Sequence, residues 1–143
     1  RACTDLVALG ERQIIVDCDV IEADGGTRTA SITGAFVSLA LALRKLKAEQ
    51  GIDRQILTGW LSAVSVGVVE GTPMLDLCYE EDSKAGTDMN VVAFEDGRLV
   101  EVQGTAEHGA YSRAELDRML DLSLAGIVNL CGFQKSALGG ILP

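Results

Sequence analysis

A glycine-rich turn, Asp24–Ser31, most constrains how this chain can fold, because it joins two apolar runs of different character. The run before it, Ile14–Ile21, has the length of a strand, and the run after it, Ile32–Leu46, has the length of a helix. Glycine lets a backbone approach a neighbour closely, and the unpaired N–H groups at a helix start favour anions. Arg28 adds a planar set of donors that suits phosphate. The turn is therefore either a plain connection or a phosphate-binding loop, and we carry the second interpretation forward.

The elements on either side of the turn follow from the spacing of apolar residues. From Val16 onward, apolar residues alternate with Asp17 and Asp19, which predicts a half-buried strand. After the turn, large apolar residues recur at helical spacing as far as Leu46, and interleaved alanines widen the apolar surface. We therefore predict a helix over residues 32–48 that is buried on most sides and closed by Gly51.

The second half of the chain predicts a meander of four strands and a final helix. Alternation or apolar runs place the strands at residues 60–69, 74–79, 89–94 and 99–103, with turn signals between them. Ser112 and Glu115 have the spacing of a capping box and precede a long apolar periodicity. The expected fold class is α+β, with a mostly antiparallel sheet and two long helices.

Composition limits the function classes. The chain has 143 residues and 48% hydrophobic residues, which suits one ordered domain. We expect no membrane-spanning segment and no secretory leader, and the four cysteines form no CxxC motif, so a reduced, cytoplasmic protein is expected. The net charge of −9 argues against nucleic-acid binding, unless acidic groups serve a metal or basic surface comes from elsewhere. The chain does not begin with Met, so a piece of a longer protein is one interpretation.

Carboxylates gather between the second and third predicted strands. Asp82 ends one loop and Asp88 opens the next strand, so strand pairing would bring them together. Clustered carboxylates suit Mg²⁺ or Mn²⁺, although a solvated acidic loop is the alternative. The only histidine, His108, falls in a predicted exposed loop, and no Ser-His-Asp hydrolase pattern is present. A phosphate turn beside a metal site indicates phosphoryl chemistry. If the anion held by Arg28 is inorganic phosphate, it can itself be the nucleophile, and no histidine base is needed.

Four groups of motifs follow one another along the chain: residues 17–34 around the turn, Ala63–Gly67, Glu81–Ser83 with Thr87–Val92, and Glu101–Glu107. Together, and in this order, they resemble the motifs of the bacterial ribonuclease PH family. The resemblance extends from about residue 1 to about residue 137.

The resemblance implies a phosphorolytic 3′→5′ exoribonuclease that trims tRNA 3′ ends and releases nucleoside diphosphates. It implies that Gly26, Thr27 and Arg28 bind the attacking phosphate. It also implies that Asp82 and Asp88 are the active-site acids and hold magnesium. The family assembles as a homohexamer, a trimer of dimers, and its fold includes a left-handed βαβ crossover, an exception to the usual handedness.

Family members carry a substantial region before the residues found here, including a further phosphate-binding arginine and basic residues that guide tRNA. We therefore expect residues 1–143 to be the C-terminal portion of one such domain. Residues 1–51 would end its first half, and residues 52–143 would form its second half. On its own, this piece is expected to be inactive. Two other functions stay open: a catalytically silent RNA-binding or scaffold subunit of an exosome-like ring, and a magnesium-dependent hydrolase of small phosphate esters.

Overall fold

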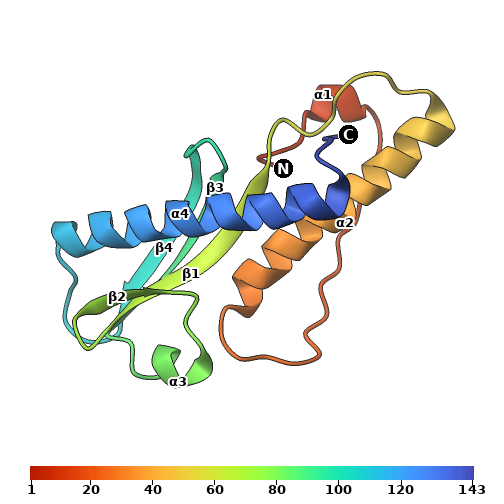
Figure 1. Ribbon diagram of the computed structural model, residues 1–143. Coiled ribbons are helices and arrows are strands. Elements are labelled where there is room, and N and C mark those ends of the chain that lie inside the picture. Colours follow the sequence, from red (N-terminus) through yellow and green to blue (C-terminus); the bar gives the residue numbers. More distant parts are fainter.

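The computed structural model describes residues 1–143, and Figure 1 shows two long helices packed around a small sheet. The elements, in chain order, are α1 (Leu6–Leu9), α2 (Thr27–Gln50), β1 (Leu61–Val69), β2 (Thr72–Leu75), α3 (Tyr79–Asp82), β3 (Thr87–Phe94), β4 (Leu99–Ala106) and α4 (Arg113–Leu138). The predicted α+β class with two long helices is confirmed.

Local capping signals set the ends of both long helices. α2 ends at Gly51, whose left-handed backbone (φ 63°) lets its N–H bond to the carbonyl of Lys47. α4 begins with the predicted capping box: the Ser112 hydroxyl accepts a hydrogen bond from the N–H of Glu115, and the Glu115 carboxylate accepts one from the N–H of Ser112. These signals act within four residues, so they are readable from sequence.

The predicted strand at Ile14–Ile21 is wrong. These residues form an extended coil that pairs with no strand, and in Figure 1 the coil loops away from the sheet before it enters α2. Ile15 is 80% exposed and Ile21 is 96% exposed. An alternating pattern makes a strand only where a neighbouring strand satisfies its backbone groups, and this segment has no such neighbour.

The sheet has the strand order β2-β1-β3-β4, and every neighbouring pair is antiparallel. The predicted meander is therefore wrong in order, because the chain returns from β2 to the far side of β1. The strand predicted over 74–79 is shifted: β2 begins at Thr72 and stops at Leu75, Asp76 adopts a left-handed backbone (φ 58°), and α3 begins at Tyr79. The left-handed crossover implied by the resemblance joins parallel strands, and the four strands described here pair antiparallel, so the crossover stays a prediction.

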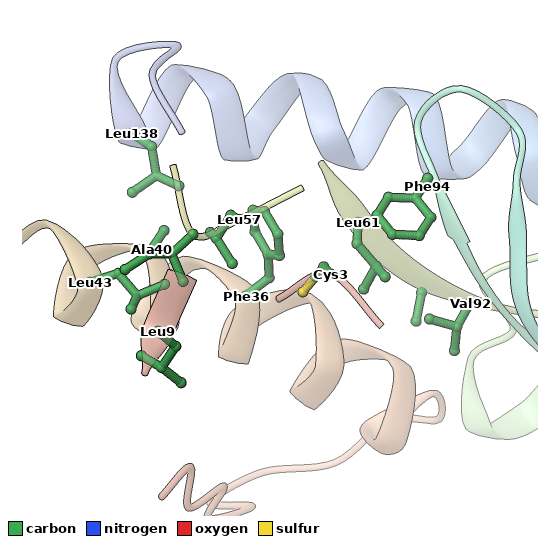
Figure 2. Packing of buried hydrophobic residues seen from close by; sticks show 12 residues of the cluster. Cys3, Leu9, Phe36, Ala40, Leu43, Leu57, Leu61, Val92, Phe94 and Leu138 are labelled. Atoms are coloured by element: carbon green, nitrogen blue, oxygen red, sulfur yellow. The ribbon is translucent and has the colours of Figure 1, made fainter. Parts of the chain in front are cut away.

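Each face of the sheet carries one long helix. α4 covers one face, where Met119, Ile127 and Cys131 pack with buried residues of β1 and β3 such as Val66 and Met89. α2 covers the start of the other face, and Figure 2 shows its buried residues pointing toward the first residues of β1 and the end of β3. The side chains drawn there include Phe36, Ala40, Leu43, Leu57, Leu61, Val92 and Phe94.

The prediction that α2 is buried on most sides is wrong. Four of its side chains are buried, and Leu41 remains 52% exposed. α2 is long and apolar enough to cross a membrane, but length and composition are weak criteria, and the core helices of globular proteins meet them as well. The apolar surface that the alanines widen is therefore only partly covered by the rest of this chain.

Two polar side chains replace a missing strand partner at the start of β1. β2 pairs only with the second half of β1, so the backbone of Leu61 and Ala63 has no strand on that side. The Thr33 hydroxyl accepts a hydrogen bond from the N–H of Ala63 (3.0 Å) and donates one to its carbonyl (3.1 Å). The Gln134 amide donates to the carbonyls of Leu61 (3.0 Å) and Thr33 (3.1 Å). These bonds fix α2 and α4 against the same edge of β1.

Candidate active site

The glycine-rich stretch leads into α2, as the sequence predicts, but the helix begins at Thr27 and not at residue 32, so Thr27–Ser31 are its first residues. Gly26 is the residue before the helix, in a left-handed backbone (φ 58°), and no side chain caps this end. The first intrahelical bond of the turn runs from the N–H of Ala30 to the carbonyl of Gly26 (2.9 Å). The N–H groups of Thr27 and Arg28 precede that bond, so they remain donors for an anion.

Arg28 reaches across to β4. One guanidinium nitrogen lies 2.9 Å from each carboxylate oxygen of Glu101, and the two side chains are 49% and 37% exposed. An ion pair at this exposure contributes about 0–1 kcal/mol to stability. Glu101 therefore orients Arg28 over the sheet, and a phosphate can compete for the same guanidinium at small cost.

The residues between β2 and α3 attach the turn to the sheet. A Cβ atom at Gly25 (φ 88°) would lie 2.3 Å from the carbonyl oxygen of Leu77, so only glycine allows this contact. A Cβ atom at Gly67 of β1 would lie 2.6 Å from the side chain of Leu77. The Asp24 carboxylate accepts a hydrogen bond from the N–H of Tyr79 (3.1 Å), the first residue of α3. The turn, α3 and β1 are thus held together through Leu77 and Tyr79.

The two predicted acids line one cavity. Asp82 is the last residue of α3, and Asp88 is the second residue of β3. They line a cavity of about 340 Å³ whose other lining residues are Ser83, Lys84, Ala85, Glu107 and His108. Burial raises the pKa of the Asp88 carboxyl above its usual 3.8, and the negative charges of Asp82 and Glu107 raise it further. A cation in this cavity would relieve that repulsion.

The carboxylates that line this cavity suit magnesium, which proteins usually hold through only one or two carboxylates. No three acidic, histidine or cysteine side chains of the chain form a ready-made metal cluster. Magnesium rarely needs one, because it keeps several waters and is held by one or two carboxylates together with phosphate oxygens of the substrate. The carboxylates of Asp82 and Asp88 are hard oxygen ligands of that kind.

The phosphate turn and the acids lie on adjacent parts of one sheet face. A Cβ atom at Gly26 would lie 3.2 Å from the hydroxyl oxygen of Ser65 in β1, so the turn rests on that residue. Ser65 pairs with Asn90, and Asp88 is two residues before Asn90 on the same face. Such diagonal neighbours are about 7–8 Å apart, so Ser65, which contacts the turn, lies about that far from Asp88 on the same sheet face.

Four residues near this site did not stand out from sequence reasoning. Ser65, Glu101 and Glu107 are distant from the turn and from the acids in sequence, and strand register or loop packing brings them close. His108 is exposed as predicted, yet it also lines the acidic cavity. Strand register places the polar residues Ser65, Asn90 and Gln103 in one row across three strands, a juxtaposition that the spacing within each strand does not reveal.

Comparisons with known proteins agree on one family. Residues 59–126 match the family described as "3′ exoribonuclease family, domain 2". The chain is 51% identical over 140 residues to ribonuclease PH of Solibacter usitatus, and the aligned region covers 98% of the chain and 59% of that relative. It is 55% identical over 141 residues to ribonuclease PH of Bdellovibrio bacteriovorus, covering 99% of the chain and 58% of that relative. The chain thus spans somewhat more than half the length of these relatives.

A solved structure supports the fold independently. Rrp46 from rice (Oryza sativa) superposes with a TM-score of 0.64 at 20% sequence identity, covering 82% of this chain and 49% of that protein. At this identity, the comparison supports the arrangement of helices and strands, and the site has to be argued from the residues themselves.

Proposed function

The chain belongs to the ribonuclease PH family, and from this premise we propose that it forms part of a phosphorolytic 3′→5′ exoribonuclease that trims tRNA 3′ ends. The observation that carries the proposal is the placement of the phosphate turn and the acidic cavity on one sheet face, joined through α3. Arg28, Asp82 and Asp88 are all present, so each group that the chemistry needs from this part of the family is available.

In the proposed reaction, inorganic phosphate is the attacking reagent. The N–H groups at the start of α2 and the Arg28 guanidinium bind it and leave one oxygen free to attack the last phosphodiester of the RNA. A bond forms between that oxygen and the phosphorus atom, and the bond from phosphorus to the O3′ atom of the preceding nucleotide breaks. The products are a nucleoside diphosphate and a shortened RNA whose O3′ atom takes up a proton.

The acids take the other role. Asp82 and Asp88 would hold Mg²⁺ (or Mn²⁺), which supplies charge neutralisation at the scissile phosphate when bound. Both carboxylates must be ionised for this, and a bound cation would favour the ionised form of Asp88, whose pKa is raised by burial and by the charges of Asp82 and Glu107. Glu107 adds negative charge to the same cavity and strengthens its attraction for a cation.

The alternative of a silent RNA-binding or scaffold subunit is less well supported. A subunit that only binds RNA needs neither a guanidinium at the start of α2 nor two carboxylates at one cavity, where burial and the neighbouring negative charges raise the pKa of Asp88. A magnesium-dependent hydrolase would use the acids and leave the phosphate turn without a role. The reaction product separates the two chemistries, because hydrolysis releases a monophosphate and phosphorolysis releases a diphosphate.

The test uses the full-length protein, a tRNA with extra 3′ nucleotides and Mg²⁺, with and without inorganic phosphate. Nucleoside diphosphates that appear only with phosphate support the proposal. Trimming at the same rate without phosphate overturns it, and the absence of any trimming while RNA is bound favours the silent subunit. Asp88→Ala is expected to abolish trimming, to leave RNA binding in place and not to lower thermal stability.

We also propose that the full-length protein assembles as a homohexamer, a trimer of dimers. Support comes from family membership and from the apolar side chains that this chain leaves exposed on the extended coil before α2, on β4 and on α4, such as Ile21, Val100 and Phe133. Light scattering coupled to size exclusion gives the oligomer mass directly. A monomer at micromolar concentration contradicts this part of the proposal and leaves the chemistry to be tested separately.

A further inference from the structure

One buried hydroxyl in this chain has no hydrogen-bond partner. The hydroxyl oxygen of Ser65 is shielded from solvent and unpaired. The one other buried, unpaired side-chain oxygen belongs to Gln134, and its amide nitrogen makes two hydrogen bonds to backbone carbonyls. Ser65 is therefore the residue whose only polar side-chain group, the hydroxyl, is buried without a hydrogen bond in this chain.

Such a group is costly and needs a reason. A buried donor without a partner costs about 1–3 kcal/mol, and native structures contain few of them. Alanine would fill the position without that cost. The neighbouring buried serine of β1 shows the usual solution, since the Ser62 hydroxyl donates to the carbonyl of Ile127 (3.3 Å) on the opposite face of the sheet.

The position of Ser65 indicates what its partner is. Its hydroxyl oxygen lies 3.2 Å from the position that a Cβ atom would take at Gly26, the residue from which α2 starts. On the other side it is a diagonal neighbour of Asp88. The hydroxyl thus lies next to the residue from which α2 starts, on the sheet face that also carries Asp88.

We infer that Ser65 is a further phosphate-binding residue: its hydroxyl donates a hydrogen bond to the inorganic phosphate held by Gly26, Thr27 and Arg28. This inference rests on the proposed function. A hydroxyl can donate to a phosphate oxygen, which the carboxylate of Asp88 cannot do. A donor from the sheet would complement those from the helix start and fix the rotation of the phosphate, and with it the direction of the attacking oxygen.

The test measures phosphate binding without RNA, by equilibrium dialysis of the full-length protein against labelled inorganic phosphate. In Ser65→Ala, phosphate affinity is expected to fall about 10-fold, the value of one hydrogen bond to a charged group. The melting temperature without phosphate should stay the same or rise, because an unpaired buried donor has been removed. A merely structural serine would give the rise without the loss of affinity.

Ser62→Ala is the matched control. It removes a serine of the same strand whose hydroxyl is bonded, so it should lower stability and leave phosphate affinity within twofold of wild type. Ser65→Cys keeps the shape with a weaker donor and should bind phosphate with intermediate affinity. If Ser65→Ala does not fold, the phosphate affinity of Ser65→Cys tests the inference instead: an intermediate affinity supports it, and wild-type affinity overturns it.

The outcomes separate this inference from the proposed function. Phosphate binding that falls in Arg28→Ala and is unchanged in both Ser65→Ala and Ser65→Cys overturns the inference and leaves the proposed function standing. Wild-type protein that binds no phosphate overturns both. Loss of affinity in Ser65→Ala with unchanged affinity in Ser62→Ala supports the assignment of Ser65 to the phosphate site.

Discussion

Single charged residues in this site are held loosely enough to change partners. Arg28 is paired with Glu101 at half exposure, so the pair adds little to stability and the guanidinium is free to bind phosphate. We expect Arg28→Ala to weaken phosphate binding about 10- to 100-fold, the value of a charge-assisted hydrogen bond, with an unfolding free energy within about 1 kcal/mol of wild type. Phosphate dialysis and urea denaturation measure the two quantities.

Glu101→Gln gives the opposite expectation at the same contact. It removes the carboxylate that competes with phosphate for Arg28, so phosphate should bind as tightly as in wild type or more tightly. A loss of affinity in this variant would show that Glu101 has to orient Arg28 before phosphate arrives.

Asp88 makes a prediction about pH. Its pKa is raised above 3.8, so the folded protein holds this proton more tightly than the unfolded chain does. Proton binding by Asp88 therefore stabilises the folded state fully below pH 3.8, and this stabilisation is lost as pH rises through the folded-state pKa. Asp88→Asn should be more stable than wild type at pH 7, and the difference should shrink as pH falls toward 3.8. Urea midpoints across this range check the sign, and a less stable Asn variant at pH 7 contradicts it.

At this scale, sequence reasoning could name the residues of local motifs and could not name their neighbours. Gly26, Thr27 and Arg28 stand in one short turn, and Asp82 and Asp88 stand in one loop region, so motif and chemistry point to them. Ser65 and Glu107 reach the site only through strand register and loop packing, which depend on pairings between distant parts of the chain.

At the scale of elements, the turn before α2 depends on a backbone contact that no side chain allows. A Cβ atom at Gly25 would overlap the carbonyl of Leu77, and its φ of 88° disfavours any other residue. Gly25→Ala should separate the turn from α3 and lower the unfolding free energy by about 1–3 kcal/mol. Gly34→Ala is the control, because nothing lies within 4 Å of its added Cβ in the middle of α2. There alanine should stabilise by up to about 1 kcal/mol.

The elements found from sequence are those whose signals are local. The capping box at Ser112 and the closing glycine of α2 act within a turn and were predicted. The strand expected at Ile14–Ile21 was wrong, because pairing needs a partner that no periodicity specifies. α3 was missed because it has only four residues, and its capping box uses Cys78, which is not a usual cap.

At the scale of the molecule, the net charge of −9 and the acidic cavity set the response to cations. Sodium screens all surface charges by a general mechanism that depends on ionic strength. Magnesium does the same and, in the proposed function, also binds to Asp82 and Asp88. A site that binds only the folded state stabilises it by about 1.4 kcal/mol when the free cation is tenfold above its dissociation constant.

We therefore expect millimolar MgCl₂ to raise the melting temperature by a few degrees beyond NaCl of the same ionic strength. In Asp82→Asn with Asp88→Asn the two salts should act alike, because the specific component is gone and the general screening remains. Glu80→Gln is the control for charge alone, since it removes one carboxylate of α3 that does not line the cavity. A magnesium effect that persists in the double variant, or that Glu80→Gln removes, would place the cation elsewhere on the acidic surface and leave Asp82 and Asp88 without their proposed role.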